Sequence, residues 1–255
     1  MLSTVWLTVI FTLAGAAVGS FLNVCILRIP EGLSVVYPPS RCPHCGHPIR
    51  IRDNIPVVSY LLLRGKCRDC RAPISGRYAL VEVMTAAFAC LLFLHYGLTY
   101  SYLVTFLFVC VLIVIAFIDL DHQIIPHLLT LSGIPLFALL SFGFIGLSLL
   151  DIFLGIMIGA GVLYFVAVYY EALTGREGMG GGDVNLLAML GAFLGWRSLL
   201  FILLMSSLAG AVVGLLLILL KGKDMKYAVP FGPFLCLAAA AYLFWGNELN
   251  LLLGL

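Results

Sequence analysis

Two aspartates lie at the ends of uncharged segments, and their residue type suits acid–base chemistry. Asp119 follows the uncharged run 83–118, and Asp183 follows the three glycines at 180–182. Carboxylates at membrane depth are energetically costly, so they are functional candidates by default. Two carboxylates held close in a low-dielectric pocket cannot both ionise, so one keeps a proton while the other acts as a base toward water. The pair therefore predicts the chemistry of an aspartic peptidase.

Asp121 competes with Asp119 for membership of this pair. Two residues along a helix are separated by about 200°, so Asp119 and Asp121 cannot both face Asp183 unless the helix has already ended. Proton-coupled transporters also place acids and broken helices at membrane depth, and they form the main alternative class. A position near one membrane face, rather than at the midplane, argues against a transporter.

Four cysteines form a second group with a defined chemistry. Cys42 and Cys45 make one C-x-x-C pair, and Cys67 and Cys70 make another, within the polar segment 30–77. Two such pairs supply four thiolates for a tetrahedral, structural Zn²⁺ site, and a small module gains folding free energy from the metal. Redox chemistry is the weaker alternative, because a thioredoxin-like motif requires one C-x-x-C beside a βαβ pattern. A cytoplasmic location also disfavours disulfides.

The composition indicates the elements that must position these residues. Of 255 residues, 63% are hydrophobic and 10% are charged, which excludes an ordinary soluble domain. A helical pass needs about 20 apolar residues. The sequence predicts an all-α polytopic membrane protein with about eight transmembrane helices and a small zinc-ribbon-like insertion between helices 1 and 2. The expected helices are residues 2–28, 78–96, 100–119, 127–143, 150–171, 183–196, 198–220 and 229–246.

Charge decides the topology, because segment 183–196 is short for a membrane span. If it crosses and segment 30–77 is cytoplasmic, 13 of the 14 Lys and Arg residues lie in the cytoplasm and only Arg197 lies outside, as the positive-inside rule requires. Both termini are then outside.

The first apolar run is longer than a cleavable signal, so we expect a retained helix. The formal charge of +2 gives no indication of nucleic-acid binding.

Two further acids have structural explanations. Asp151 is expected to cap the outer end of a helix. Glu82 is expected to pair with Arg77 or to be hydrated at the cytoplasmic interface.

The predicted domains are 1–29, the first transmembrane helix; 30–77, a cytoplasmic zinc-binding module; and 78–255, a seven-helix membrane domain.

Beyond these residues, the whole chain resembles the bacterial type IV prepilin peptidases, which belong to the GxGD intramembrane aspartic proteases. The resemblance is carried by Gly19–Val24 with Arg28–Pro30, the two C-x-x-C pairs, Ser75–Glu82, Asp119–Pro126, Gly180–Ala188, Gly191–Ala192 and Pro230–Phe234. The family's D-x-x-x-x-x-I-P element begins at Asp119, which selects this residue over Asp121. Its G-x-G-D aspartate is Asp183. The chain departs from the family at Asn185, where the family usually has lysine.

The resemblance implies an inner-membrane enzyme that cleaves type IV prepilins or pseudopilins at the cytoplasmic face. Cleavage follows the glycine that ends a short basic leader. It also implies a methyltransferase activity that uses S-adenosylmethionine to methylate the new N-terminus. Gly65 and Lys66 match positions that the family associates with methyl transfer. From composition alone, this pair is a turn beside a zinc knuckle. The expected partners are these protein substrates and membrane lipid.

Overall fold

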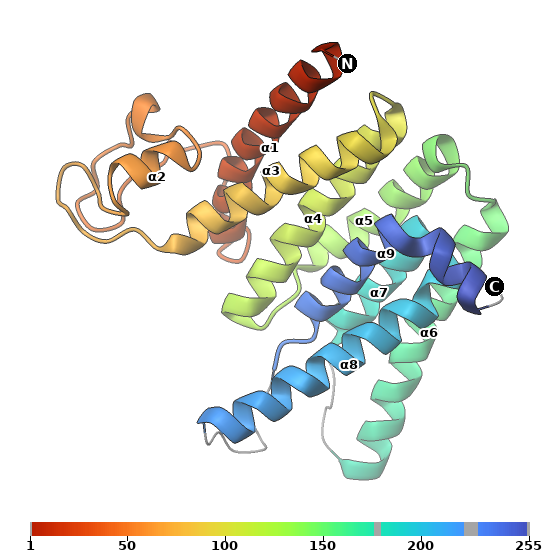
Figure 1. Cartoon of the computed structure of the whole chain (residues 1–255). Coiled ribbons are helices and arrows are strands. Elements are labelled where there is room, and N and C mark those ends of the chain that lie inside the picture. The colour runs from red at the N-terminus through yellow and green to blue at the C-terminus, as the bar shows by residue number, and fades with distance from the viewer. Residues whose placement is uncertain (1, 176–179, 222–228, 254–255) are drawn as a thin grey trace. The chain divides into compact units, whose positions relative to one another are not determined.

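The computed structural model describes residues 2–175, 180–221 and 229–253 (Figure 1). Within them the regular elements are all helical, and two isolated β-bridges occur in the cysteine segment. The elements are α1 (Leu2–Arg28), η1 (Ile51–Asp53), α2 (Val58–Leu62), α3 (Gly76–Tyr96), α4 (Tyr100–His122), α5 (His127–Leu140), η2 (Ser141–Ile145), α6 (Leu149–Thr174), α7 (Gly181–Leu194), α8 (Trp196–Lys221) and α9 (Gly232–Leu253).

All eight expected apolar helices are present. Six are long and apolar enough to cross a membrane: α1, α3, α4, α5 extended through η2, α6 and α8. The apolar helices Gly181–Leu194 and Gly232–Gly246 are shorter. The long run 83–118 is divided at Gly97, whose left-handed φ of 65° ends α3, because a residue without Cβ adopts this conformation at little cost. The all-helical membrane fold is confirmed.

The chain divides into two compact units, residues 1–114 and 115–255. In the first unit, α1 packs along α3 through small residues. Gly15 faces Ala89, and a Cβ on Gly19 would lie 2.8 Å from the Cα of Glu82. The four-residue spacing of these glycines lets the two helix backbones approach closely, as in small-xxx-small packing between membrane helices.

The cysteine segment is tied to α3 by a buried acid. The Glu82 carboxylate is 9% exposed, and its Oε2 accepts a hydrogen bond of 2.7 Å from the backbone N–H of Val57. The expectation that Glu82 is hydrated was therefore wrong. Val57 directly precedes α2 and has a left-handed φ of 61°, and its N–H is satisfied by this long-range bond. The carboxylate thus anchors the polar segment to the membrane helix.

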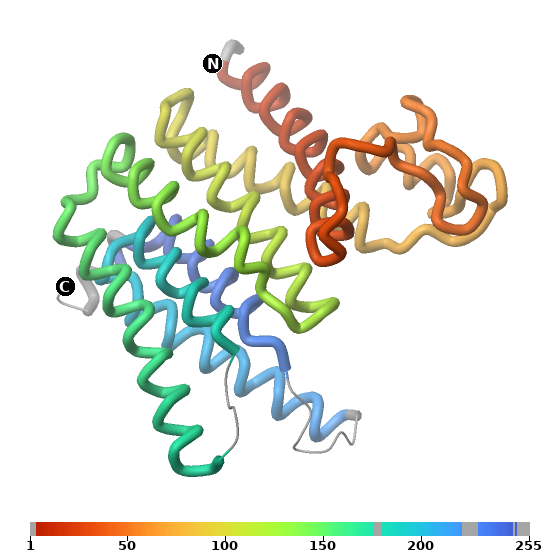
Figure 2. The backbone as a smooth tube through the Cα atoms, turned by 180° about the vertical axis from the view of Figure 1, so that it is seen from behind, coloured from red at the N-terminus to blue at the C-terminus, as the bar shows by residue number. Residues whose placement is uncertain are grey.

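The second unit is built around α7. Residues 186–193 of this helix are buried, and α5, α6, α8 and α9 all contact it (Figures 1 and 2). A helix that is apolar on every side is stable only when other elements surround it. Contact with α6 is close, because Gly155 packs against Gly191 and Gly159 packs against Leu187. The shortest expected span is therefore the centre of this unit.

Asp151 has a structural role at the start of α6, but it is not the cap that the sequence predicts. Ser148 caps the helix, and its Oγ accepts from the Asp151 N–H at 3.1 Å and donates to Asp151 Oδ2 at 2.6 Å. Asp151 Oδ1 accepts from the indole N–H of Trp196 at 3.1 Å. The carboxylate thus fixes the start of α6 beside the start of α8.

Candidate active site and metal centre

Asp119 is buried in the last turn of α4, with 5% of its surface exposed. Its Oδ2 accepts a hydrogen bond of 3.0 Å from the backbone N–H of Gly232, the first residue of α9. A Cβ at residue 232 would lie 2.6 Å from this oxygen, so only glycine allows the approach. The unsatisfied N–H groups at a helix N-terminus favour an anionic partner.

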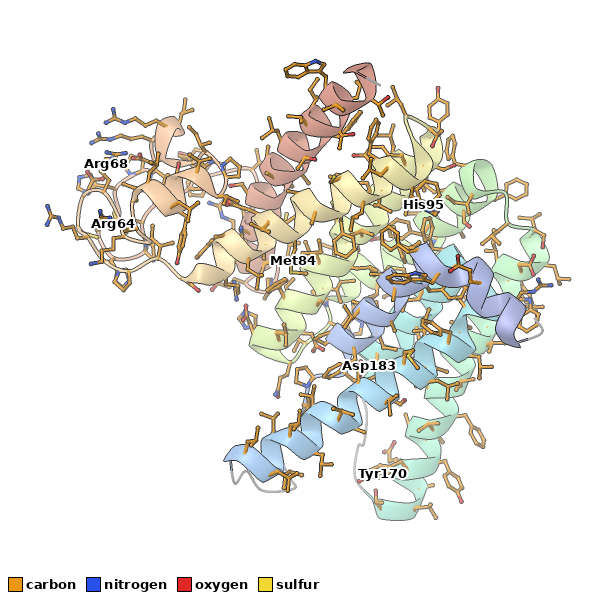
Figure 3. The ribbon with its side chains drawn as sticks, viewed as in Figure 1. Arg64, Arg68, Met84, His95, Tyr170 and Asp183 are labelled. Atoms are coloured by element: carbon orange, nitrogen blue, oxygen red, sulfur yellow. The ribbon has the colours of Figure 1, made fainter. Side chains whose placement is uncertain are left out.

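Asp183 lies in the first turn of α7, after Gly180 has capped the helix. Figure 3 labels it at this end of α7. Its Oδ1 is buried and has no hydrogen-bond partner among the described residues. An unpartnered buried oxygen is rare in native structures and calls for an explanation, such as a catalytic role.

Ile125 joins the elements that carry the two aspartates. A Cβ on Gly182 would lie 2.8 Å from the Cβ of Ile125, and a Cβ on Gly232 would lie 3.1 Å from its Cδ1. The Ile125 side chain is buried and lies between the first turn of α7 and the start of α9. The glycine before Asp183 and the glycine that binds Asp119 are both fitted to this side chain.

Asp121 lies apart from this site. Helix α4 continues to His122, so Asp119 and Asp121 are on different sides of it, and Asp121 is exposed. This is the arrangement expected if Asp119, and not Asp121, faces Asp183. Pro126 is the N-cap residue of α5.

Asn185, which departs from the family pattern, is hydrogen-bonded to a histidine. Its Nδ2 lies 3.1 Å from Nδ1 of His127, the first residue of α5. Asn185 follows Asp183 by two residues, and His127 follows Ile125 by two residues. The pair thus links α5 to α7 beside the candidate catalytic residues.

The four cysteines converge in the first unit. The Sγ atoms of Cys42, Cys45, Cys67 and Cys70 all lie within 4.8 Å of one another. The Sγ atoms of Cys42 and Cys70 are 3.8 Å apart, and four sulfurs at about 2.3 Å from a tetrahedral Zn²⁺ are about 3.8 Å apart. The cluster therefore has the geometry and the donor set of a closed, four-thiolate metal site.

Each half of this cluster is formed locally and in the same way. The N–H of Cys42 binds the carbonyl of His47, and the N–H of Cys67 binds the carbonyl of Ala72, each at 2.9 Å. Backbone N–H groups of Cys45 and His44 lower the pKa of the Cys42 thiol to about 6. A thiolate is the form that binds metal, so the backbone prepares Cys42, though not Cys45, whose pKa is raised to about 12, for a ligand role.

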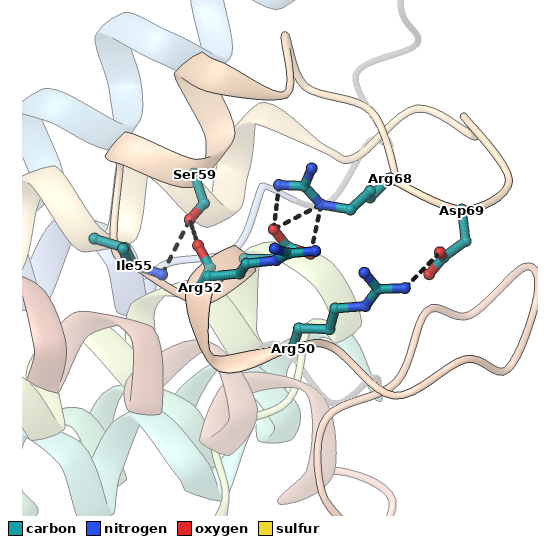
Figure 4. A network of polar contacts seen from close by, with 7 residues as sticks. Arg50, Arg52, Ile55, Ser59, Arg68 and Asp69 are labelled. Atoms are coloured by element: carbon teal, nitrogen blue, oxygen red, sulfur yellow. Dashed lines mark hydrogen bonds and ion pairs between the residues drawn. The ribbon is translucent and has the colours of Figure 1, made fainter.

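Ion pairs hold the polar segment around the cluster (Figure 4). The guanidinium of Arg68 donates to both carboxylate oxygens of Asp53, with a shortest distance of 2.6 Å, and this bond lowers the pKa of Asp53. Arg50 lies 3.5 Å from Asp69. Arg68 and Asp69 both lie inside the second C-x-x-C pair, so these contacts connect that knuckle to residues 50–53.

Gly65 and Lys66 form the turn that leads into Cys67. Gly65 has a φ of 64°, and a Cβ there would lie 3.0 Å from the hydroxyl of Tyr60. Its carbonyl accepts from the N–H of Ile74 at 2.7 Å, and Lys66 bridges to Pro73. These contacts explain why residue 65 is glycine. The Lys66 side chain is exposed, so its ammonium is accessible to an anionic group.

The contacts that three residues make in or near these sites were not predicted from the sequence. Gly232 and Ile125 lie within motifs that the resemblance quoted, but their function is a contact between distant segments. Glu82 was assigned to the interface. The one sequence feature that could have indicated a close contact is Gly232, a glycine between Phe231 and Pro233 at the expected start of a helix.

Comparison with known proteins identifies the family. A family model for the bacterial peptidase A24 N-terminal domain matches residues 13–96, which include all four clustered cysteines. A model for the type IV leader peptidase family matches residues 106–215, which include Asp119 and Asp183. No solved structure matches the chain.

The curated relatives carry one name, prepilin leader peptidase/N-methyltransferase. One from Aeromonas hydrophila is 42% identical over 91% of this chain and 89% of its own length. One from Pseudomonas aeruginosa is 38% identical, over 93% and 90%. One from Myxococcus xanthus is 46% identical over 82% of this chain and 62% of its own length.

These matches confirm the expected enzyme class, a leader peptidase with methyltransferase activity, and give no support to the transporter alternative. They also agree with a multi-pass inner-membrane protein. The two matched regions extend over most of the chain and contain both candidate sites. The chain belongs to the type IV leader peptidase family.

Proposed function

We propose that the chain hydrolyses the leader peptide bond of prepilins or pseudopilins with Asp119 and Asp183 as its catalytic pair. The observation that carries this proposal is the convergence of two acids, from α4 and α7, on one buried site beside Ile125. Aspartic peptidases need two carboxylates that share one proton. Asp121 is exposed on another side of α4 and is therefore not assigned to the pair.

The surroundings of the two acids differ, and this difference assigns their roles. Asp119 accepts the Gly232 N–H, and a hydrogen bond to the charged form favours the carboxylate. We therefore assign Asp119 as the base that takes a proton from water. Asp183, whose Oδ1 receives no hydrogen bond among the described residues, is assigned as the acid that protonates the scissile carbonyl oxygen. Collapse of the tetrahedral intermediate then returns a proton to the departing amine.

The substrate orientation follows from the charges of the chain. Arg28 and eight further basic residues between positions 41 and 77 favour a cytoplasmic position for segment 30–77. The start of α7 and the end of α4 then lie at the cytoplasmic end of the bundle. A prepilin would keep its basic leader in the cytoplasm, while its apolar helix enters the membrane and brings the scissile bond to the two aspartates.

The cysteine cluster is assigned as a structural zinc site. Four thiolates complete a tetrahedral shell, which leaves no position for water or substrate, so Cys42, Cys45, Cys67 and Cys70 would hold the metal without taking part in hydrolysis. For methyl transfer, Gly65 and Lys66 are the candidate contacts for S-adenosylmethionine. The exposed Lys66 ammonium suits an anionic group of that molecule. When bound, S-adenosylmethionine supplies the methyl group for the new N-terminal amine.

The decisive experiment is a cleavage assay with the full chain in membranes, a prepilin substrate and product mass as the readout. The wild-type chain is expected to remove the leader, and to add one methyl group only when S-adenosylmethionine is present. Asp183→Asn and Asp119→Asn are expected to fold but to lower cleavage by at least about 10²–10⁴-fold, the usual contribution of general acid–base catalysis.

The matched control is Asp121→Asn, which removes a carboxylate two residues from Asp119 and should cleave normally. Equal loss in Asp121→Asn would reassign the pair. Normal processing by Asp183→Asn would reject the mechanism.

A further inference from the structure

A cavity of about 470 Å³, open on one side, lies in the second unit, between α6, α8 and the segment that leads into α9. Its lining is apolar apart from the hydroxyl of Ser207. Helices α6 and α8 diverge on this side in both views (Figures 1 and 2). The volume is within the usual range for ligand sites, roughly 300–1,000 Å³, and is large enough for more than one side chain.

The cavity adjoins Asp119 through α9. Phe231 lines it, and the next residue, Gly232, donates its N–H to the Asp119 carboxylate. Phe234 also lines the cavity. A Cβ on Gly210 of α8 would lie 3.6 Å from the Phe234 ring and 4.0 Å from the Phe231 ring. The two rings thus line the side of the cavity next to Gly232, whose N–H binds Asp119, the proposed catalytic base.

The cavity adjoins Asp183 through α6. Gly155 packs on Gly191, and Gly159 packs on Leu187. Four residues forward along α6 therefore correspond to four residues backward along α7, so the two helices are antiparallel. The next step places Leu163 at the level of Asp183. Leu163 is 4% exposed and lines the same cavity. The cavity therefore lies beside α6, which packs on the helix that carries Asp183, and beside Phe231, which precedes the residue that binds Asp119.

We infer that this cavity is the substrate subsite for the apolar side chains that directly follow the scissile bond. The inference rests on the proposed function. A prepilin chain has a polar leader on one side of that bond and an apolar helix on the other, and the apolar lining suits only the second. Ser207, Gly210 and Ala211 share one face of α8 at i, i+3 and i+4. Such small residues let a substrate backbone approach the helix closely.

A filling substitution tests the inference by changing specificity. Two prepilins would differ only in the first helical turn after the cleavage site, with large apolar residues in one and alanines in the other. The wild-type chain is expected to favour the large side chains in kcat/KM. Ala211→Phe occupies the cavity, and it should lower kcat/KM for the large substrate at least tenfold while leaving the alanine substrate close to its wild-type value.

Val212→Phe is the matched control, because the neighbouring Val212 is exposed and does not line the cavity. It should keep the wild-type preference. As a second measurement, a photoreactive benzoylphenylalanine at position 207, in an Asp183→Asn background, is expected to cross-link to the first turn of the mature segment.

An unchanged preference in Ala211→Phe, equal losses for both substrates, or a cross-link that is absent or maps to the leader would overturn the inference. A wild-type chain that cleaves neither prepilin would instead reject the proposed function.

Discussion

The cysteine cluster and the aspartate pair are both small constellations of reactive side chains, but the chain builds them in different ways. Each cysteine knuckle is closed by backbone hydrogen bonds within six residues, such as the bond from Cys42 to His47. The aspartate site depends on contacts such as that between Gly232 and Asp119, which are 113 residues apart. The first site is built from two locally closed halves, whereas the second exists only when the helices have packed.

The largest expected effect comes from removing the metal ligands. Cys42→Ser combined with Cys67→Ser removes one ligand from each knuckle, and zinc binding typically contributes about 10–16 kcal/mol to a small zinc module. Metal analysis of the purified variant should find that bound zinc is lost, and limited proteolysis should cut within residues 30–77.

The aspartate site is held by contacts among residues 115–255 and not by the cysteine segment. These helices should therefore keep their resistance to proteolysis in this variant. A chain that retains its zinc after both substitutions would show that the cysteine cluster is not the metal site.

Gly232→Ala should damage the aspartate site and spare the metal. The new Cβ would lie 2.6 Å from the Asp119 carboxylate and 3.1 Å from Ile125, so the carboxylate must shift. Displacement of a catalytic group by about 1 Å costs on the order of 100-fold in rate, which leader cleavage would measure.

Gly181→Ala is its control, because a Cβ at residue 181 meets nothing within 4 Å. It should change cleavage little. If both alanine variants cleaved equally well, close packing at Gly232 would not be what holds Asp119.

The Asn185–His127 hydrogen bond tests how strongly α5 and α7 are coupled beside the aspartates. A double-mutant cycle of Asn185→Ala and His127→Ala should give a coupling energy of about 0.5–1.5 kcal/mol in stability, the net value of one hydrogen bond. Thermal unfolding of the four proteins measures it. Strictly additive losses would mean that the contact contributes nothing.

The smallest effect is expected at the second knuckle. Gly46 and Arg71 occupy equivalent positions after their cysteine pairs, with φ values of 71° and 58°. When the residue is arginine, this left-handed conformation destabilises the folded state by about 1–2 kcal/mol. Glycine removes this strain, but its larger loss of backbone entropy on folding offsets part of the gain. Arg71→Gly should therefore slow zinc release to a chelator slightly, and faster release would contradict the equivalence of the two knuckles.

The sequence predicted most elements because their signals are local or compositional. The uncharged runs gave the eight apolar helices within a few residues, and Gly97 and Pro126 stand where helices end or begin. The C-x-x-C pairs predicted the cysteine cluster because each pair fixes two ligands by itself. The contact between Glu82 and the backbone N–H of Val57 was not predicted, because nothing near Glu82 along the chain indicates that residue 57 would reach it.

By itself, the sequence determined the residue types, the helices, the four cysteines that cluster and, through its motifs, the family. Only the tertiary structure decided that Asp119 is buried and Asp121 exposed, that Ile125 fits between two glycines, and that an apolar cavity forms next to Phe231. The physical reason is that periodicity and spacing act over a few residues. The burial of a carboxylate and the shape of a cavity depend instead on which distant helices pack against each other.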